Sequence, residues 1–135
     1  AQMNLKHMKL RGHKMGKHKS VVTKYENFSA FSGSPKQCEH HLVFGRGIRQ
    51  LADDDGIWIP LLDEEHNASE KGIKFQIHEN PAAEKLSKMC GQLAWERKYL
   101  ADKLASDENL GHQSSEDWMD EAREAFRNRY GESWL

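Results

Sequence analysis

A helical pattern that begins at Asn80-Pro81 is the strongest constraint on how this chain folds. Asn suits the cap before a helix, and Pro suits the first helical position because the N–H that it lacks would have no partner there. Apolar residues then recur at helical spacing, which predicts one long helix over residues 81–105. We expect its apolar positions to face the core: Leu86, Met89, Cys90, Leu93, Leu100 and Leu104.

Two short apolar segments before this helix predict strands. Residues 38–44 become apolar toward their end, and residues 57–62 are β-branched and aromatic. Residues 45–56, which lie between them, are rich in turn signals. A last helix is predicted over residues 116–130, with Gly131 at its C-terminal cap. The order strand, strand, helices predicts a small α+β domain.

Charge is unevenly distributed along the chain, although the net charge is only −1. Residues 1–24 hold seven Lys and Arg residues and no acid, whereas the other 13 basic and 21 acidic residues give −8. A basic arm on an acidic body recurs in proteins that touch nucleic acid, and a plain solvated tail is the alternative. We therefore divide the chain into a basic flexible arm (1–24), a domain that includes the long helix (25–110) and a C-terminal helix packed on that domain (111–135).

Cysteine content and hydropathy bear on the compartment. The two cysteines, Cys38 and Cys90, do not form a disulfide framework. No window approaches the length of a membrane-spanning helix, and no apolar signal core follows the basic start. We therefore expect a reducing, cytoplasmic setting and no membrane partner.

The adjacent histidines His40 and His41 carry the clearest chemistry. Phosphodiester cleavage needs a group that deprotonates water, and a divalent metal can stabilise the leaving oxygen and offset the added charge. Neighbouring side chains on an extended segment point to opposite faces, so one imidazole can hold a metal while the other activates water. His66 and His78 could complete the ligand set, and imidazole suits Zn, Mn or Ni better than Mg. From the residues alone, surface or core histidines remain the alternative.

Charged residues near this pair add weaker signals. Arg46 and Arg49 could hold the scissile phosphate, because a guanidinium forms paired hydrogen bonds with phosphate, or they could be solvated. The three consecutive acids at residues 53–55 are interpreted as a turn, since they cannot all face one ion.

Several of these motifs together resemble the HNH (His-Me finger) endonucleases, most closely the small versions carried by bacteriophages and prophages. Segment 38–45 is similar to their His-His-x-x-Phe-Gly motif, and segment 91–96 to their Gly-Gln-x-x-aromatic-Glu helix. The resemblance covers about residues 38–131 and is closest over 38–96. The matching positions are His40, His41, Phe44, Gly45, Arg49, Gly56, His66 and His78.

This resemblance implies a ββα-metal core with additional C-terminal helices, acting as a phage-encoded endonuclease on DNA during processing or recombination in a bacterial host cell. It implies one divalent metal (Mg, Mn, Zn or Ni) and no other cofactor. It makes His41 the general base, His40 and His66 metal ligands, and His78 a further ligand. A structural zinc is not implied, because the Cys-x-x-Cys pairs of some members are missing.

Three further expectations accompany the nuclease hypothesis: two alternative functions and a possible homodimer. Many family members brace the base-bearing loop with an Asn, and residues 56–57 offer none. A catalytically weak or inactive DNA-binding accessory protein is therefore one alternative, and a domain whose histidines hold a structural metal is another. The C-terminal helices could also pair two chains into a homodimer.

Overall fold

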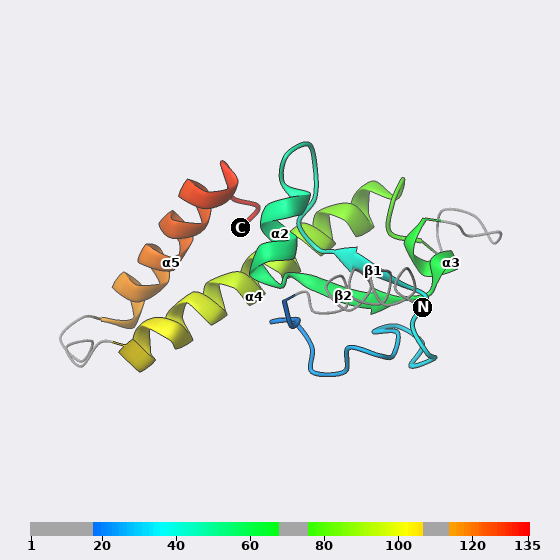
Figure 1. The fold of residues 1–135 in the computed structure, drawn as a ribbon. Coiled ribbons are helices and arrows are strands. Elements are labelled where there is room, and N and C mark those ends of the chain that lie inside the picture. Colours follow the sequence, from blue (N-terminus) through cyan, green and yellow to red (C-terminus); the bar gives the residue numbers. More distant parts are fainter. Residues whose placement is uncertain (1–17, 68–75, 107–113) are drawn as a thin grey trace, which may run out of the picture.

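The structure is a computed structural model that describes residues 18–67, 76–106 and 114–135 (Figure 1). It is a mixed α+β fold, as predicted, with a small two-stranded sheet and several helices. Residues 1–17, most of the expected basic arm, lie outside the described residues. The elements are β1 (Cys38–His41), α2 (Arg49–Asp55), β2 (Trp58–Leu61), α3 (Asp63–His66), α4 (Pro81–Ser106) and α5 (Ser115–Tyr130).

The sheet is antiparallel, and its register pairs Cys38 with Leu61 and His41 with Trp58. Both strands fall inside the predicted segments. The backbone pairing extends one step further, because the N–H of Leu42 donates to the carbonyl of Ile57 at 3.0 Å. This pairing fixes the end of β1, where the two adjacent histidines stand, against the start of β2.

Helix α2 replaces the turn that we expected at residues 53–55. It ends at Gly56, which has a left-handed φ of 73° and whose N–H caps the carbonyls of Ala52 and Asp53. A Cβ atom on Gly56 would lie only 2.2 Å from the carbonyl oxygen of Lys19, so glycine is required there. The three acids therefore form the last turn of a helix, where successive side chains point about 100° apart.

Residues 18–21 pass beside this helix end and β2. The N–H of Val21 donates to the carbonyl of Gly56 at 2.9 Å. The Ser20 hydroxyl donates to the carbonyl of Trp58 at 2.7 Å, and the Trp58 indole donates to the carbonyl of His18 at 3.0 Å. These bonds attach the start of the described chain to the sheet.

The acid Asp55 connects α2 to both long helices. Its carboxylate accepts two hydrogen bonds from the Arg129 guanidinium, at 2.6 and 2.7 Å, and one from the Tyr130 hydroxyl at 2.6 Å. The Trp95 indole of α4 donates to the same carboxylate at 2.9 Å. Burial, followed by the bond to Asp55, raises the pKa of Tyr130, so its hydroxyl stays a donor.

Helices α4 and α5 run side by side and extend away from the sheet (Figure 1). Ser114 caps α5 by accepting from the N–H of Asp117, and Gly131 ends it in a left-handed conformation, as predicted. On α4, Gln92 and Glu96 are buried. Gln92 accepts from the N–H of Trp134 at 2.7 Å, and Glu96 pairs with Arg123 at 3.2 Å. These polar contacts fasten the C-terminal residues to α4.

The predicted core face of α4 is mostly exposed, and only Met89 and Leu100 are half-buried. Leu86, Leu93 and Leu104 are 59 %, 53 % and 55 % exposed, whereas Ser87, Gly91, Gln92 and Glu96 are buried. The core instead forms from the strand ends, α2 and α5, with Val43, Ile57, Leu61 and Phe126 fully buried. None of the helices in the described part of the chain combines the length and apolarity that a bilayer crossing needs.

Gly91 is the point at which α4 contacts the sheet most closely. A Cβ atom there would lie 2.7 Å from a methyl carbon of Val43 and 2.9 Å from Cβ of Leu42. The sheet end can therefore approach the helix only because this position lacks a side chain.

Replacing Gly91 with alanine should destabilise the protein although alanine favours helix. We expect Gly91→Ala to lower the free energy of unfolding by about 1–3 kcal/mol, because overpacking outweighs the gain of about 1 kcal/mol in helix propensity. Urea unfolding measures this, with the exposed Lys85→Ala on the same helix as control. An unchanged or higher midpoint for Gly91→Ala would show that α4 does not contact the sheet here.

Candidate metal centre

Three histidines from separate parts of the sequence meet at one point. His40 lies in β1, His66 at the end of α3 and His78 just before α4. Each offers a ring nitrogen, and the three nitrogens lie within 4.8 Å of one another. Their ring centroids are 5.0 Å (His40–His66), 5.1 Å (His40–His78) and 4.7 Å (His66–His78) apart. We call these three residues the histidine cluster.

Backbone hydrogen bonds hold the cluster together. The N–H of Ile77 donates to the carbonyl of Glu65 at 2.9 Å, and the N–H of His78 donates to that of His66 at 3.1 Å. The side-chain carboxylate of Glu65 also accepts from the N–H of Leu62 at 2.8 Å and from the Ser29 hydroxyl at 2.5 Å. These two bonds anchor α3. The spacing of His66 and His78 is therefore fixed by the main chain.

His40 is fully buried, and one of its nitrogens has no partner. The Ser87 hydroxyl donates its single proton to the carbonyl of Leu42 at 2.8 Å, so its oxygen must accept from Nε2–H of His40 at 2.7 Å. That assignment leaves Nδ1 of His40 as a lone pair. Among the described residues, Nδ1 has no hydrogen-bond partner although it is buried. A buried unpartnered nitrogen in a histidine cluster fits a metal ligand.

The charge state of the cluster also suits a cation. Burial, followed by the neighbouring histidines His66 and His78, lowers the pKa of His40 to about 3. Burial, followed by the charge of His78, also lowers the pKa of His66. Both rings are therefore neutral near pH 7, which is the form that binds a metal.

Polar neighbours orient the other two rings. Nδ1 of His78 lies 3.4 Å from a carboxylate oxygen of Glu84, which can only accept. Nδ1 of His66 lies 3.6 Å from Sγ of Cys38. Burial, assisted by Asp63, raises the pKa of Cys38 to about 12, and this thiol is not among the three groups that lie close enough to share an ion. These contacts leave Nε2 of His66 and His78 for a cation.

Phe44 covers the cluster on one side. Its ring lies 5.6 Å from that of His40 and 4.7 Å from that of His78, and the Lys88 ammonium lies 4.7 Å from its centroid. An apolar wall of this kind limits water access and strengthens the interaction between a cation and its ligands. Two nitrogens bound tetrahedrally to one zinc ion are about 3.3 Å apart, so the rings need only small inward movements.

His41 has a different set of neighbours from His40. Its Nε2 lies 2.9 Å from a carboxylate oxygen of Asp53 on α2, and its side chain is nearly buried. A pocket of about 480 Å³ adjoins it, lined by His41, Gly47, Arg49, Gln50 and Asp53. The carboxylate can only accept, so Nε2 carries the proton and Nδ1 of His41 remains free to accept one.

The pocket and the histidine cluster lie within electrostatic reach of each other. Beyond burial and His78, the charges of His41 and Arg49 also lower the pKa of His66. Arg49 is exposed and lines the pocket. Arg46 is exposed too, but it is not among the lining residues.

Sequence reasoning missed Ser87, Glu84 and Asp53 as partners of these histidines. Asp53 could have been found only if residues 49–55 had been recognised as a helix. Ser87 falls on the polar side of α4, the side that periodicity assigns to solvent. Gly91, one helical turn after Ser87 on this side, was the available signal that the side packs closely against the sheet.

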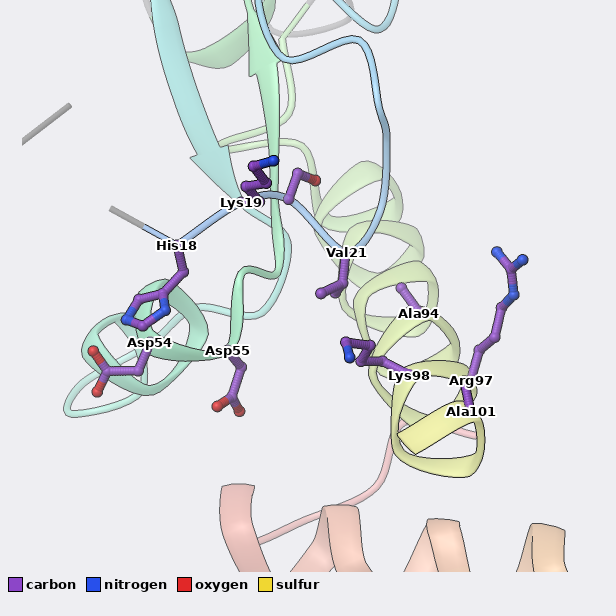
Figure 2. A pocket seen from close by; sticks show the side chains of 10 residues that line it. His18, Lys19, Val21, Asp54, Asp55, Ala94, Arg97, Lys98 and Ala101 are labelled. Atoms are coloured by element: carbon purple, nitrogen blue, oxygen red, sulfur yellow. The ribbon is translucent and has the colours of Figure 1, made fainter. Parts of the chain in front are cut away.

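A second pocket, of about 540 Å³, lies between residues 18–21, the end of α2 and α4. It mixes charges, because its lining includes Lys19 and Lys98 together with Asp54 and Asp55 (Figure 2). The carboxylate of Asp55 is already used by Arg129 and Tyr130. None of the three clustered histidines lines this pocket, so it is not the metal centre.

Removing the Ser87 hydroxyl should weaken metal binding without touching a ligand. We expect Ser87→Ala to lower Zn²⁺ affinity about 10–100-fold, because Nε2–H of His40 loses the acceptor that fixes its tautomer. Competition with a chromophoric chelator measures the affinity. Ser106→Ala, an exposed serine on the same helix, is the matched control. Equal affinities for the two variants would contradict the assignment of Nδ1 as the ligand atom.

Comparison with known proteins gives no relative for this site. No protein-family model matches the chain, and neither a curated protein nor a solved structure matches it. The function is therefore argued from the geometry of the histidine cluster and the pocket beside it.

Proposed function

We propose that this chain is a metal-dependent endonuclease that hydrolyses DNA phosphodiester bonds. In this proposal β1, β2 and α3 form a ββα-metal core of the HNH (His-Me finger) type. The single observation that carries it is the pairing of two sites along one strand. His40 belongs to a three-histidine cluster, and the next residue, His41, opens onto a pocket beside a carboxylate.

The histidine cluster would hold the cation. The ligand atoms would be Nδ1 of His40 and Nε2 of His66 and His78, the nitrogens left after their neighbours are assigned. Three imidazoles favour ions such as Zn²⁺ or Ni²⁺ over Mg²⁺ and leave coordination positions open. When bound, a divalent cation stabilises the charge on the phosphate and on the leaving oxygen.

His41 would be the general base. Asp53 accepts from Nε2–H and so fixes the tautomer in which Nδ1 can take a proton from water. The same carboxylate stabilises the imidazolium that forms, as in other base–carboxylate pairs. Asp53 thus provides an orienting contact for the base-bearing segment, which lacks the Asn found in many HNH enzymes.

Arg49 would bind the phosphate next to the base. It lines the pocket that His41 opens onto, and its guanidinium suits two oxygens of one phosphate. Arg46 and the basic residues Lys19 and Lys24 are exposed and could contact neighbouring phosphates, so binding should weaken as salt rises.

Substitution of His41 tests this proposal most directly. We expect His41→Ala to lower the plasmid-nicking rate about 10²–10⁴-fold, the usual contribution of a general base. Zn²⁺ and DNA affinities should stay near those of the parent, because His41 is not a ligand. His18→Ala, an exposed histidine of the other pocket, is the control and should nick at the parental rate.

Each outcome of this assay leads to a different conclusion about the function. Nicking by His41→Ala within twofold of the parent would refute the role of His41. If the parent fails to nick with Zn²⁺, Mn²⁺, Ni²⁺ or Mg²⁺ yet binds DNA, the chain is an inactive DNA-binding accessory protein. Metal binding without any DNA affinity would leave the cluster a structural site.

A further inference from the structure

Helix α4 presents an apolar stripe to solvent. Leu86, Leu93 and Leu104 are each more than half exposed, and Cys90 is exposed as well. The stripe follows intervals of four, three, four, three and four residues along one side of the helix. Its members are Leu86, Cys90, Leu93, Arg97, Leu100 and Leu104.

The two sides of α4 are reversed relative to an ordinary surface helix. The side that packs on the protein carries Ser87, Gly91, Gln92 and Glu96, all buried. Leucines face water on the opposite side, although a surface helix normally buries its apolar side. Exposed leucines gathered on one side of a helix indicate an interaction site. Leu100 is the one leucine of the stripe that is half-buried.

The spacing indicates what covers the stripe. Alternating intervals of three and four residues are the seam of a two-stranded coiled coil, in which a similar helix packs alongside. From Leu86 to Leu104 the seam is about 27 Å long, at 1.5 Å rise per residue. The stripe also matches itself when a second copy runs in the opposite direction. Leu86 then faces Leu104, Cys90 faces Leu100, and Leu93 faces Arg97.

The charge on the stripe selects this antiparallel direction. A parallel pair in register would set the two Arg97 side chains against each other, which is repulsive. In the antiparallel pair each Arg97 lies opposite a leucine, and its long stem can pack while the guanidinium reaches the edge. Arg97 lines the second pocket, but its guanidinium points away from Lys98 (Figure 2).

Small residues beside the stripe allow the two helices to approach closely. Ala94 and Ala101 lie next to the stripe on the side of the second pocket (Figure 2). Interaxial distances between packed helices are about 8–10 Å, and small side chains favour the lower end of that range.

We propose that two copies of this chain form a two-fold symmetric dimer by antiparallel pairing of the α4 stripes. Such a contact uses the same surface on both copies, as closed dimers do. The proposal is independent of nuclease activity, because it involves neither the histidine cluster nor the pocket beside His41.

Sedimentation equilibrium over a concentration series tests the dimer. The parent should sediment as a dimer at micromolar concentrations. Leu93→Lys places a cation opposite Arg97 of the other copy at the centre of the contact, and this repulsion should weaken association more than about 100-fold. Met119→Lys is the matched control, since Met119 on α5 is 54 % exposed against 53 % for Leu93. It should leave the dimer intact.

Two results would overturn the proposal. One is a parent protein that stays monomeric across the series. The other is a Leu93→Lys variant that remains folded by circular dichroism and dimerises as well as Met119→Lys.

Thiol cross-linking tests the direction separately. In the antiparallel pair Cys90 of one copy lies about 15 Å along the axis from Cys90 of the other, but directly opposite residue 100. A short bismaleimide should therefore link Leu100→Cys chains efficiently and the parent poorly. Efficient linkage of the parent, lost in Cys90→Ser, would show a parallel pair and contradict the proposed arrangement.

Discussion

The hydrogen bond between His40 and Ser87 determines which ring nitrogen of His40 the candidate metal centre can offer to a cation. Ser87 donates its proton to the carbonyl of Leu42, so it can only accept from His40. The proton of the buried imidazole is therefore on Nε2, and Nδ1 is left as a lone pair without a protein partner among the described residues. Leu42 directly follows the two histidines in the chain. The same bond thus joins α4 to the end of β1 and leaves Nδ1 as the nitrogen that His40 can offer to a cation.

Close contact between α4 and the sheet is what allows this bond to form. Gly91 lies one helical turn after Ser87 and admits Val43 and Leu42 against the helix backbone. Asp55 and its partners Trp95, Arg129 and Tyr130 hold α2 against both long helices. Asp53, which belongs to the same turn of α2, then reaches His41. The packing of α2 and α4 therefore gives two adjacent histidines two different sets of partners.

Much of the secondary structure could be predicted from local signals. Asn80-Pro81 and Gly131 marked helix ends, and the apolar segments marked both strands, because capping and strand preferences depend on neighbouring residues. The helix at Arg49–Asp55 was missed, since a run of three aspartates is usually a turn. Here Asp53 and Asp55 instead contact side chains that are distant in the sequence. The core face of α4 was assigned wrongly because periodicity reports an apolar side without saying what covers it.

The candidate site was predictable in its ligand residues but not in its supporting contacts. The grouping of His40 with His66 and His78 was expected from the family resemblance, and the three side chains do meet. Ser87 and Glu84 come from a helix that begins after all three histidines, and no local spacing relates them to a ring nitrogen. Their roles depend on where α4 lies, which is a property of tertiary packing.

X-ray absorption spectroscopy of the Zn²⁺-loaded protein tests the metal centre most directly. We predict one tightly bound ion per chain, with three imidazole nitrogens at about 2.0–2.1 Å and the remaining coordination by oxygen. His66→Ala should lose one imidazole from the spectrum and most of the affinity. A parent protein that binds no zinc, or a spectrum with sulfur in the first coordination shell, would contradict this account.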